Sequence, residues 1–526
     1  MLCGGSPFTD FEGSPVDNAT VIARFLSWAE ADPDRVFLNT ESDSVTFSEV
    51  DARSSAVAVG LTRNGVGPGD RVGVALQNTP EFVYSVLGCW RMGAVVVPVN
   101  PMYRERELLH VVQDSAMSAL LADLALAPVV EALNARGVRL PTWFGEGNTP
   151  YRLNRLFDLL HDNAGRKFEP YPWKLDDVAL LTYTSGTTGR SKGAMNTHSN
   201  LAYQGTALPR ILGLDPERDA ILSLAPMFHI TGLVLHLVTA VGSGCRLVLT
   251  GRFVPAGVAA LIERRKPTFT IGATTAFISL LRDGEARKRD LSSLTKVLTG
   301  GAPVPPSVVE ELEAVFGFYV HNAYGLTETT AAVTTVPLGV RAPVDPVTGS
   351  LSVGKTMPEV EAVILNDDGT PLPDGEIGEL ALRGPQVSAG YWMNPDATAA
   401  AFIGGRFATG DVALRDADGW IYIVDRKKDM IIASGYKIWP REVEDVLYEH
   451  PAVKEAAVVG VHDDYRGETI HAFVSIKEGA DVSAEALQAH CREKLAAYKC
   501  PTEVKFLPDL PKTVTGKIIR RELRSG

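Results

Sequence analysis

A twelve-residue stretch, Thr182–Gly193, carries more potential chemistry than any other part of this chain. It contains three glycines, six serines or threonines and Lys192, and the apolar run Val178–Leu181 precedes it. Glycines let backbone N–H groups approach phosphate oxygens, hydroxyls add donors and a lysine adds positive charge. The pattern predicts a buried strand that leads into a phosphate-binding loop, although a polar surface loop can have a similar composition. It is not a P-loop, because Ser191 rather than glycine stands before the lysine.

Within this loop, we expect seven residues at the phosphates: Thr184, Ser185, Gly186, Thr187, Thr188, Gly189 and Lys192.

Five shorter motifs follow along the chain. In order, they are Gly300–Pro303 after the strand candidate Val297–Thr299, Asn322–Glu328 after the strand candidate Phe318–Val320, Thr409–Asp411, Asp425–Asp429 and Pro511–Lys517. Each has an ordinary structural explanation when it stands alone: a turn, a packed tyrosine, a surface charge or a solvated basic tail. Their order along one chain is what indicates a common site.

The elements that must position these motifs alternate in type. Arg71–Leu76, Ala94–Val99 and Ser118–Ala122 are expected strands, and Pro80–Leu87 and Glu105–Val112 are expected helices. Strands that alternate with helices predict layered α/β architecture. At 526 residues the chain is too long for one hydrophobic core and should contain several structural units.

Two later regions differ in texture. Residues 351–425 combine short β-rich segments with the turn signals Asp367–Gly369, Asp374–Gly375 and Asp418–Gly419, which predict a small, mostly antiparallel subdomain. The last hundred residues mix helices (Pro440–Leu447, Ser483–Leu495) with strands (Ala456–Val461, His471–Ile476). We therefore expect an N-terminal domain over 1–425, a hinge over 426–429 and a mobile α+β domain over 430–526.

Composition limits the class of protein. An apolar content of 45%, a charged content of 22% and a net charge of −12 describe a globular protein and argue against a main role in binding nucleic acid. The five cysteines are scattered without a Cys-x-x-Cys pair, so we expect reduced thiols. No secretory signal and no apolar run of about 18 residues is present, so we expect no membrane span and a cytoplasmic location.

Taken together and in this order, the motifs resemble those of the adenylate-forming superfamily, which includes acyl-CoA synthetases, peptide-synthetase adenylation domains and firefly luciferases. The similarity extends from about residue 20 to residue 524, and it is closest to bacterial medium- or long-chain fatty-acyl-CoA and aryl-CoA ligases. The resemblance implies ATP, Mg²⁺ and coenzyme A as cofactors or co-substrates. It also implies two steps: a carboxylic acid and ATP give an acyl-adenylate, and a thiol then displaces AMP.

The resemblance assigns most of the motifs to the nucleotide. Tyr324 would stack on adenine, Asp411 and Arg426 would hold the ribose, and Glu328 would bind Mg²⁺, a hard cation that prefers carboxylate and phosphate oxygens. The other residues implied beside the nucleotide are Gly300, Gly301, Ala302, Pro303, Asn322, Ala323, Gly325 and Thr327.

Lys517 is the expected catalyst. Acyl-adenylate formation brings a negative carboxylate onto a negative α-phosphate, and a lysine between them offsets the charge that builds up. In the family this lysine lies on the mobile domain, and Lys428 occupies the hinge position. Rotation would withdraw Lys517 and bring Ser434, Gly435 and Tyr436 to the site, where glycine would leave room for a pantetheine arm.

Pro226–Leu233 resembles the segment that contacts the acid. His229 stands where peptide-synthetase domains carry an aspartate for the amino group, so an α-amino acid is not expected as the substrate. Gly325 stands where acetate-activating relatives carry a tryptophan, so we expect an acid larger than acetate. His229 would contact the substrate carboxylate or gate the pocket, unless it is a hydrogen-bonded structural histidine.

Three alternatives remain open from the sequence. Many relatives have Pro-Asp-Pro where this chain has His462-Asp463-Asp464, so an amine could replace coenzyme A as acceptor and the product would be an amide. A nucleotide-dependent oxidoreductase would need Gly-x-Gly-x-x-Gly after a strand, and Gly145–Pro150 fails at its last position. A non-catalytic nucleotide-binding protein would not need Lys517 on a mobile domain. The oligomeric state is left open.

Overall fold

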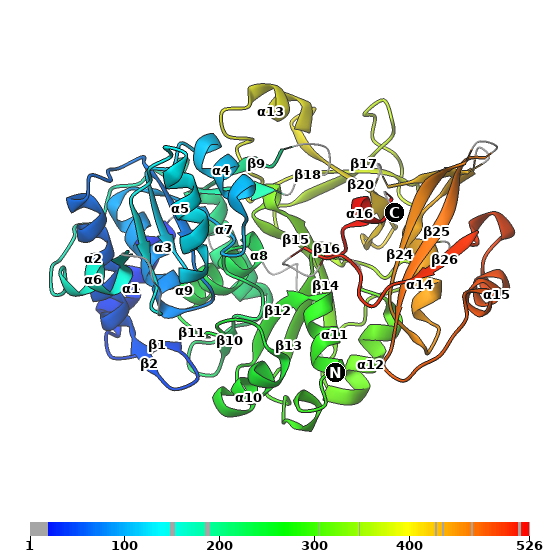
Figure 1. Cartoon of the computed structure of the whole chain (residues 1–526), viewed down its shortest axis with the longest axis horizontal. Coiled ribbons are helices and arrows are strands. Elements are labelled where there is room, and N and C mark those ends of the chain that lie inside the picture. The colour runs from blue at the N-terminus through cyan, green and yellow to red at the C-terminus, as the bar shows by residue number, and fades with distance from the viewer. Residues whose placement is uncertain are drawn as a thin grey trace.

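Two large, mostly parallel sheets form the greater part of the computed structural model (Figure 1). The structure describes residues 19–147, 153–184, 190–302, 304–346, 348–426, 429–433, 436–463, 466–513 and 517–524. The seven-stranded sheet has the order β7-β6-β5-β3-β4-β8-β9, and the nine-stranded sheet has the order β16-β15-β14-β13-β12-β10-β11-β1-β2. These sheets confirm the predicted layered α/β class.

The strands of the seven-stranded sheet are β3 (Arg71–Ala75), β4 (Val95–Pro98), β5 (Ala119–Ala122), β6 (Thr142–Phe144), β7 (Asn154–Arg155), β8 (Val178–Thr184) and β9 (Lys192–Thr197). Those of the nine-stranded sheet are β1 (Val36–Asn39), β2 (Ser44–Thr46), β10 (Ala220–Leu222), β11 (Arg246–Val248), β12 (Phe269–Ala273), β13 (Lys296–Gly300), β14 (Val320–Leu326), β15 (Ala331–Thr335) and β16 (Lys355–Thr356).

Helices fill the space between the two sheets and cover both outer faces. The inner helices include α2 (Phe47–Arg63), α3 (Pro80–Met92), α7 (His198–Ile211) and α9 (Thr239–Ser243), whose apolar side chains form one core with both sheets. The outer helices include α4 (Glu105–Asp114) and α5 (Ala127–Ala135) on the first sheet, and α10 (Pro255–Arg265), α11 (Thr274–Arg282) and α12 (Pro306–Phe316) on the second.

The period of two along β3 shows why these strands are apolar throughout. Val72 and Val74 face the inner core, whereas Ala75 faces the outer core beneath α4 and α5. A strand buried on both faces has no polar face to alternate with, as is usual for parallel sheets covered by helices.

A third, mostly antiparallel sheet matches the predicted β-rich subdomain. It contains β17 (Glu361–Leu365), β18 (Gly378–Arg383), β19 (Phe402–Ile403), β20 (Arg406–Arg415) and β21 (Ile421–Arg426). The three turns predicted from Asp-Gly pairs lie between or beside these strands, and Gly369, Gly375 and Gly419 all have positive φ. Only glycine adopts such a backbone without steric cost.

The fourth sheet forms the C-terminal α+β unit, which stands at the right of Figure 1. Its elements are β22 (Ile431–Ala433), β23 (Tyr436–Ile438), α14 (Pro440–Tyr448), β24 (Val453–Asp463), β25 (Gly467–Ile476), α15 (Ala484–Lys494), β26 (Glu503–Phe506) and α16 (Arg520–Leu523). Ser483 caps α15 as predicted, since its side chain accepts a bond from the Ala486 amide at 3.2 Å. The change from the third sheet to the fourth falls between Arg426 and Ile431, and the domain and hinge limits given above stay predictions.

One expected strand has different bounds. The prediction placed a strand at Phe318–Val320 with the Asn322–Glu328 motif after it, but β14 begins at Val320 and includes the motif as far as Leu326. Its first half pairs with β13 in parallel and its second half pairs with β15 antiparallel. The polar and small residues of the motif hide this strand from a pattern that looks for apolar runs. Within the described ranges, none of the helices combines the length and apolarity needed to cross a bilayer.

The contact between α7 and α9 generates a prediction about stability. Gly242 packs so closely on Gly205 that an added Cβ would lie 1.8 Å from the Gly205 carbonyl oxygen. Gly242→Ala should therefore lower the free energy of unfolding by about 1–3 kcal/mol or more, because the helices must move apart. The thermal unfolding midpoint measures the loss.

Gly257→Ala is the matched control. Gly257 also lies in a helix, but the nearest atom to its added Cβ is 3.9 Å away. This variant should unfold at or above the midpoint of the unchanged protein, because alanine favours a helix over glycine. Equal midpoints for the two variants would contradict the close packing of α7 and α9.

Candidate active site

The predicted phosphate loop joins two antiparallel strands at the edge of the seven-stranded sheet. Thr184 ends β8 and Lys192 begins β9, and these two residues face each other in the strand pair. Ser185, Gly186, Thr187, Thr188 and Gly189 lie outside the described residues. A cavity of about 410 Å³ borders the loop, and its lining includes Arg190, Lys192 and His110. Arg190 and Lys192 bring positive charge to this lining, which also contains the carboxylate of Asp114.

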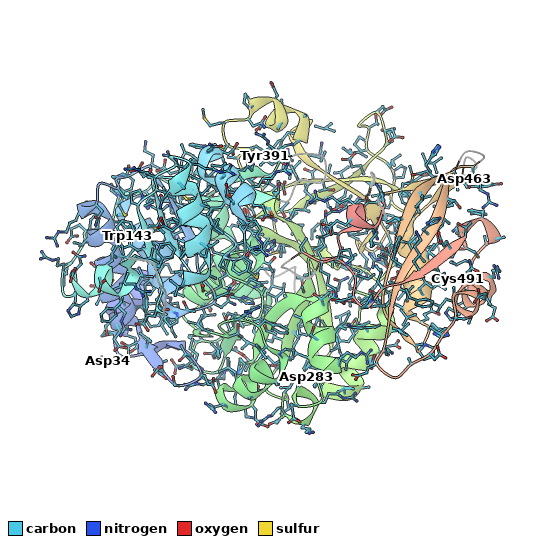
Figure 2. The ribbon with its side chains drawn as sticks, viewed as in Figure 1. Asp34, Trp143, Asp283, Tyr391, Asp463 and Cys491 are labelled. Atoms are coloured by element: carbon cyan, nitrogen blue, oxygen red, sulfur yellow. The ribbon has the colours of Figure 1, made fainter. Side chains whose placement is uncertain are left out.

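Tyr391 connects this loop to Glu328. The ammonium group of Lys192 lies 5.0 Å from the centre of the Tyr391 ring, and the Tyr391 hydroxyl donates to Glu328 Oε1 at 2.8 Å. Burial and the neighbouring Glu328 carboxylate raise the pKa of Tyr391, so this hydroxyl keeps its proton and remains a donor. Tyr391 is labelled at the top of Figure 2. The sequence prediction missed this residue, because no local pattern marks a lone tyrosine that orients a distant carboxylate.

The turn that carries Glu328 has an unusual backbone. Thr330 and Ala331, directly after the short helix Thr327–Thr329, have φ values of 50° and 76°. Non-glycine residues adopt this region at a cost of about 1–3 kcal/mol each, and such residues gather at functional sites. Asn196 of β9 fixes the turn, since its side-chain amide donates to the Thr327 carbonyl at 3.0 Å and to Thr330 Oγ1 at 2.9 Å.

The site offers Mg²⁺ one carboxylate, that of Glu328, rather than a preformed cluster of ligands. Among the described residues, no group of three or more metal-binding side chains is present. Glu328 is half-buried and already oriented by Tyr391, so its second oxygen is available to a cation that also binds nucleotide phosphates. The residues present therefore fit a metal that arrives with ATP.

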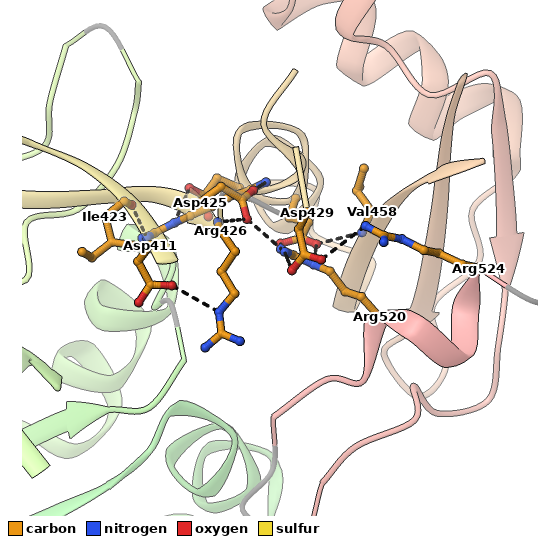
Figure 3. A network of polar contacts seen from close by, with 11 residues as sticks. Asp411, Ile423, Asp425, Arg426, Asp429, Val458, Arg520 and Arg524 are labelled. Carbon is orange, nitrogen blue, oxygen red and sulfur yellow. Dashed lines mark hydrogen bonds and ion pairs between the residues drawn. The ribbon is translucent and has the colours of Figure 1, made fainter. Parts of the chain in front are cut away.

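Three predicted ribose and adenine residues lie in direct contact. The Tyr324 hydroxyl donates to Asp411 Oδ2 at 2.6 Å, and Arg426 Nε lies 3.3 Å from Asp411 Oδ1. Asp411 and Arg426 are paired neighbours on β20 and β21, as Figure 3 shows. Burial, with the negative Asp411 next, raises the pKa of Tyr324 well above its usual value, so the phenol stays neutral. The third sheet thus brings a carboxylate to the tyrosine ring on β14.

The two predicted adenine-side loops meet at the ends of neighbouring strands. Gly300 ends β13, and an added Cβ there would lie 2.9 Å from the Ala323 carbonyl oxygen. Gly301 has a φ of 80°, and Ala302 follows it half-buried. Pro303 lies outside the described residues. Since Thr299 and Asn322 are paired, Gly300 and Ala323 bring two stretches of backbone to one edge, where a flat base could approach.

Two residues of the β14 motif have a structural reason for their identity. The buried Asn322 donates its side-chain amide to the Ser352 carbonyl at 3.2 Å and so fixes β14 to the segment before β16. At Gly325, an added Cβ would lie 1.7 Å from the Ala331 carbonyl oxygen, because β15 approaches closely at a register shift. The backbone here excludes every side chain. Glycine at this position therefore reflects strand pairing as well as any effect on pocket size.

Lys517 and His229 come from distant parts of the chain, yet the charge of Lys517 acts on the His229 imidazole. Burial and, to a lesser extent, this positive charge lower the pKa of His229 to about 4. His229 caps the helical turn Ile230–Gly232, and its Nδ1 accepts from the Thr231 amide at 3.4 Å. The imidazole is therefore neutral near pH 7, with its proton on Nε2. In Figure 1 the red segment before α16 runs from the C-terminal sheet toward β15 and β16.

Tyr436 is the one described residue among those predicted to reach the site after a rotation. Tyr436 is 54% exposed and stacks on Tyr498 with ring centres 4.5 Å apart. Lys428, Ser434 and Gly435 lie outside the described residues. The charge of Lys517 acts on His229 in this structure, whereas Tyr436 at the start of β23 packs on Tyr498.

Comparison with known proteins agrees with this arrangement. The sequence model for AMP-binding enzymes matches residues 25–392, and that for the AMP-binding enzyme C-terminal domain matches residues 442–517. A long-chain-fatty-acid–CoA ligase of Bacillus subtilis is 34% identical, with 97% of this chain and 95% of the relative covered. A feruloyl-CoA synthase of Amycolatopsis is 37% identical, with 91% and 94% covered.

A solved structure supports the same assignment. The o-succinylbenzoate CoA synthetase of Bacillus subtilis, in complex with its acyl-adenylate intermediate, has a TM-score of 0.83 and 32% identity, and the match covers 96% of this chain and 98% of that one. The ranges matched by the two family models, 25–392 and 442–517, include the β8–β9 loop, the β14 motif and Lys517. The chain therefore belongs to the family of AMP-binding enzymes, the adenylate-forming superfamily that its motifs resemble.

Proposed function

We propose that this protein is an AMP-forming carboxylic acid:CoA ligase that works through an acyl-adenylate. The observation that carries the proposal is the pair of contacts on one short motif: Tyr324 of β14 binds Asp411, and Glu328, just after β14, is oriented by Tyr391. The charge of Lys517, which acts on His229, adds to this evidence. The long-chain fatty-acid, feruloyl and o-succinylbenzoate ligases named above are its relatives, and ATP and coenzyme A follow from that family. The need for positive charge between the two anions follows from electrostatics alone.

In the first step, a carboxylate oxygen of the acid attacks the α-phosphate of ATP and pyrophosphate leaves. Lys517 offsets the negative charge that collects between the two anions. The neutral His229 donates from Nε2 to the carboxylate and so orients it without competing for a proton. Asp411 and Arg426 hold the ribose, and Lys192 attracts the outer phosphates. Mg²⁺, when bound at Glu328, supplies further positive charge to the phosphates.

In the second step, the thiol of coenzyme A attacks the acyl carbon, the bond to AMP breaks, and the thiol proton passes to solvent. We propose that the C-terminal domain rotates about residues 426–429 between the steps. Lys517 then leaves and the segment from Ser434 to Tyr436 approaches. The present position of Tyr436, exposed and stacked on Tyr498, agrees with a segment that acts only after such a rotation.

We propose a hydrophobic acid larger than acetate. The acyl-side segment after His229 is apolar and buried, with Ile230, Leu233 and Val234 at 2% exposure or below. Relatives in both the fatty and the aromatic class fit this chemistry, and a chain or a ring would bury apolar area there. A neutral histidine in place of an acidic residue offers no charge for an ammonium group.

The departure His462-Asp463-Asp464 begins at the end of β24, and its middle residue has a structural role. Asp463 ends β24 at the tip of the β24–β25 hairpin, labelled at the far right of Figure 2, and its Oδ1 accepts from the Arg466 amide at 2.8 Å. Asp463 is the aspartate shared with the Pro-Asp-Pro pattern, and the added acid, Asp464, lies outside the described residues. The relatives named above are all CoA ligases, so the amide synthetase is the alternative that they do not support.

A panel of acids tests the function directly. Short, medium, long and aromatic acids are incubated with ATP, Mg²⁺ and either coenzyme A or a primary amine, and the products are identified by mass. We expect an acyl-CoA thioester with the longer or aromatic acids. No acyl-adenylate with any acid would refute adenylation, and an amide without a thioester would refute the choice of acceptor.

Lys517→Ala should slow acyl-adenylate formation by at least roughly 100-fold, the scale expected when one charge-stabilising donor is removed. Thioester formation from supplied acyl-adenylate should change much less, because that step does not bring two anions together. Pyrophosphate release and thioester formation are measured separately. An equal loss in both steps would contradict the role of Lys517.

Glu328→Gln should raise the Mg²⁺ concentration for half-maximal pyrophosphate release by at least about tenfold, because the carboxylate ligand is lost. Tyr391→Phe keeps the carboxylate but removes the hydroxyl that orients it, so its effect should be in the same direction and smaller. A Mg²⁺ titration checks both variants. A lower maximal rate with unchanged Mg²⁺ dependence would argue against a metal at Glu328.

Lys428→Pro should slow thioester formation more than adenylation, because proline fixes its own φ and limits the pivot. The two half-reactions are measured as for Lys517→Ala. If adenylation fell further than thioester formation, the pivot would have to lie elsewhere.

A further inference from the structure

Arg520 lies three residues after Lys517 and is surrounded by carboxylates. Its guanidinium group contacts Glu444 at 2.7 and 3.1 Å, Asp425 at 3.1 Å and Asp429 at 3.5 Å. The side chains of these three acids are 11%, 3% and 12% exposed. Figure 3 shows Arg520 between Asp425 and Asp429. Buried carboxylates are stable only when charged partners and hydrogen bonds satisfy them, so the position of Arg520 is tightly determined.

The three carboxylates stand on different sides of the proposed pivot. Asp425 belongs to β21 and precedes residues 427–428, Asp429 follows them, and Glu444 lies within α14 of the C-terminal unit. Glu444 also accepts from the Val458 amide at 2.8 Å, which holds it to β24. Arg520 and Glu444 therefore move together, whereas the contact between Arg520 and Asp425 crosses the pivot.

Asp425 joins Arg520 to the nucleotide side of the site. Its Oδ1 accepts from both Arg520 and the Arg426 amide, the latter at 2.7 Å, and Arg426 in turn contacts Asp411. Its Oδ2 accepts from the Arg441 amide at 3.0 Å. The proposed ribose residues and the segment that carries Lys517 thus share one carboxylate.

Backbone hydrogen bonds join the two ends of the segment that carries Lys517. When these ends are held in place, the backbone of Lys517 is held as well. The Thr513 amide donates to the Lys517 carbonyl at 2.7 Å, and the Ile519 amide donates to the Pro511 carbonyl at 2.8 Å. At the N-terminal end of this segment, Lys512 pairs with Glu455 at 2.8 Å and with Asp509 at 2.7 Å. Both ends of the segment are therefore held in place, and the end at Arg520 is attached across the pivot.

We propose that Arg520 is a positioning residue that couples the hinge to Lys517, and that its bond to Asp425 stabilises the adenylate-forming orientation. Rotation of the C-terminal unit breaks this bond and keeps the bond to Glu444. The inference rests on the proposed two-step function. It adds a contact across the pivot that favours one of the two orientations.

Asp425→Asn tests the coupling, because it removes the charge across the pivot while an amide oxygen can still accept from Arg441. The best acid of the panel is used for pyrophosphate release, and its acyl-adenylate is supplied with coenzyme A for the second step. We expect the rate of pyrophosphate release to fall by roughly tenfold, because fewer molecules then hold the adenylate-forming orientation. The rate of the second step should stay within about twofold of that of the unchanged protein. Arg520→Lys keeps the positive charge but loses the planar guanidinium group that binds two carboxylates at once. It should likewise slow pyrophosphate release more than thioester formation.

Asp219→Asn is the matched control. Asp219 is also buried and pairs with Lys296 at 2.6 Å, far from the hinge along the nine-stranded sheet. It should lower the thermal midpoint without changing the ratio of the two half-reaction rates. If folded Asp425→Asn or Arg520→Lys protein loses both steps equally, or neither, the coupling is wrong. A failure of the proposed function is distinct, because the unchanged protein would then release no pyrophosphate with any acid.

Discussion

Repulsion between two anions governs the design of this site. An acid can join the α-phosphate only if positive groups lie between and around them, yet the chain as a whole carries a net charge of −12. The structure meets this constraint locally. Lys192 stands at the base of the phosphate loop, Arg426 lies beside Asp411, and the charge of Lys517 acts on a buried histidine whose lowered pKa keeps it neutral. The cations come from two sheets and from the segment before α16, so they meet only when the whole chain is folded.

The acidic residues of the site are equally constrained. Asp411 binds Tyr324 and Arg426, Glu328 binds Tyr391, and Asp425 binds Arg520. Each carboxylate is oriented by a donor from another element, which removes rotational freedom before any ligand arrives. The left-handed backbone at Thr330 and Ala331 serves the same end, because Asn196 holds a turn that would otherwise relax. Rigidity is concentrated where the nucleotide is expected to bind.

The sequence could predict the layered class, the β-rich insertion and the residues that stand in short runs, because runs such as Asn322–Glu328 keep neighbours together in space. It could not predict Tyr391 or Arg520, whose partners lie 63 and 76–95 positions away in the chain. Tertiary folding alone makes these pairs. From the sequence, Gly325 was interpreted only as a residue that enlarges the acid pocket. The close approach of the Ala331 backbone shows that glycine is also required sterically. The true extent of β14 was missed because its second half is polar and changes partner.

The closed segment around Lys517 has a consequence for the timing of turnover. Since both of its ends are held in place, the lysine cannot drift out of the site by itself and must travel with the whole C-terminal unit. In the proposed rotation, the reactive anhydride has to survive a large movement without meeting water. The shelter that the site gives this intermediate then becomes a requirement of turnover in its own right.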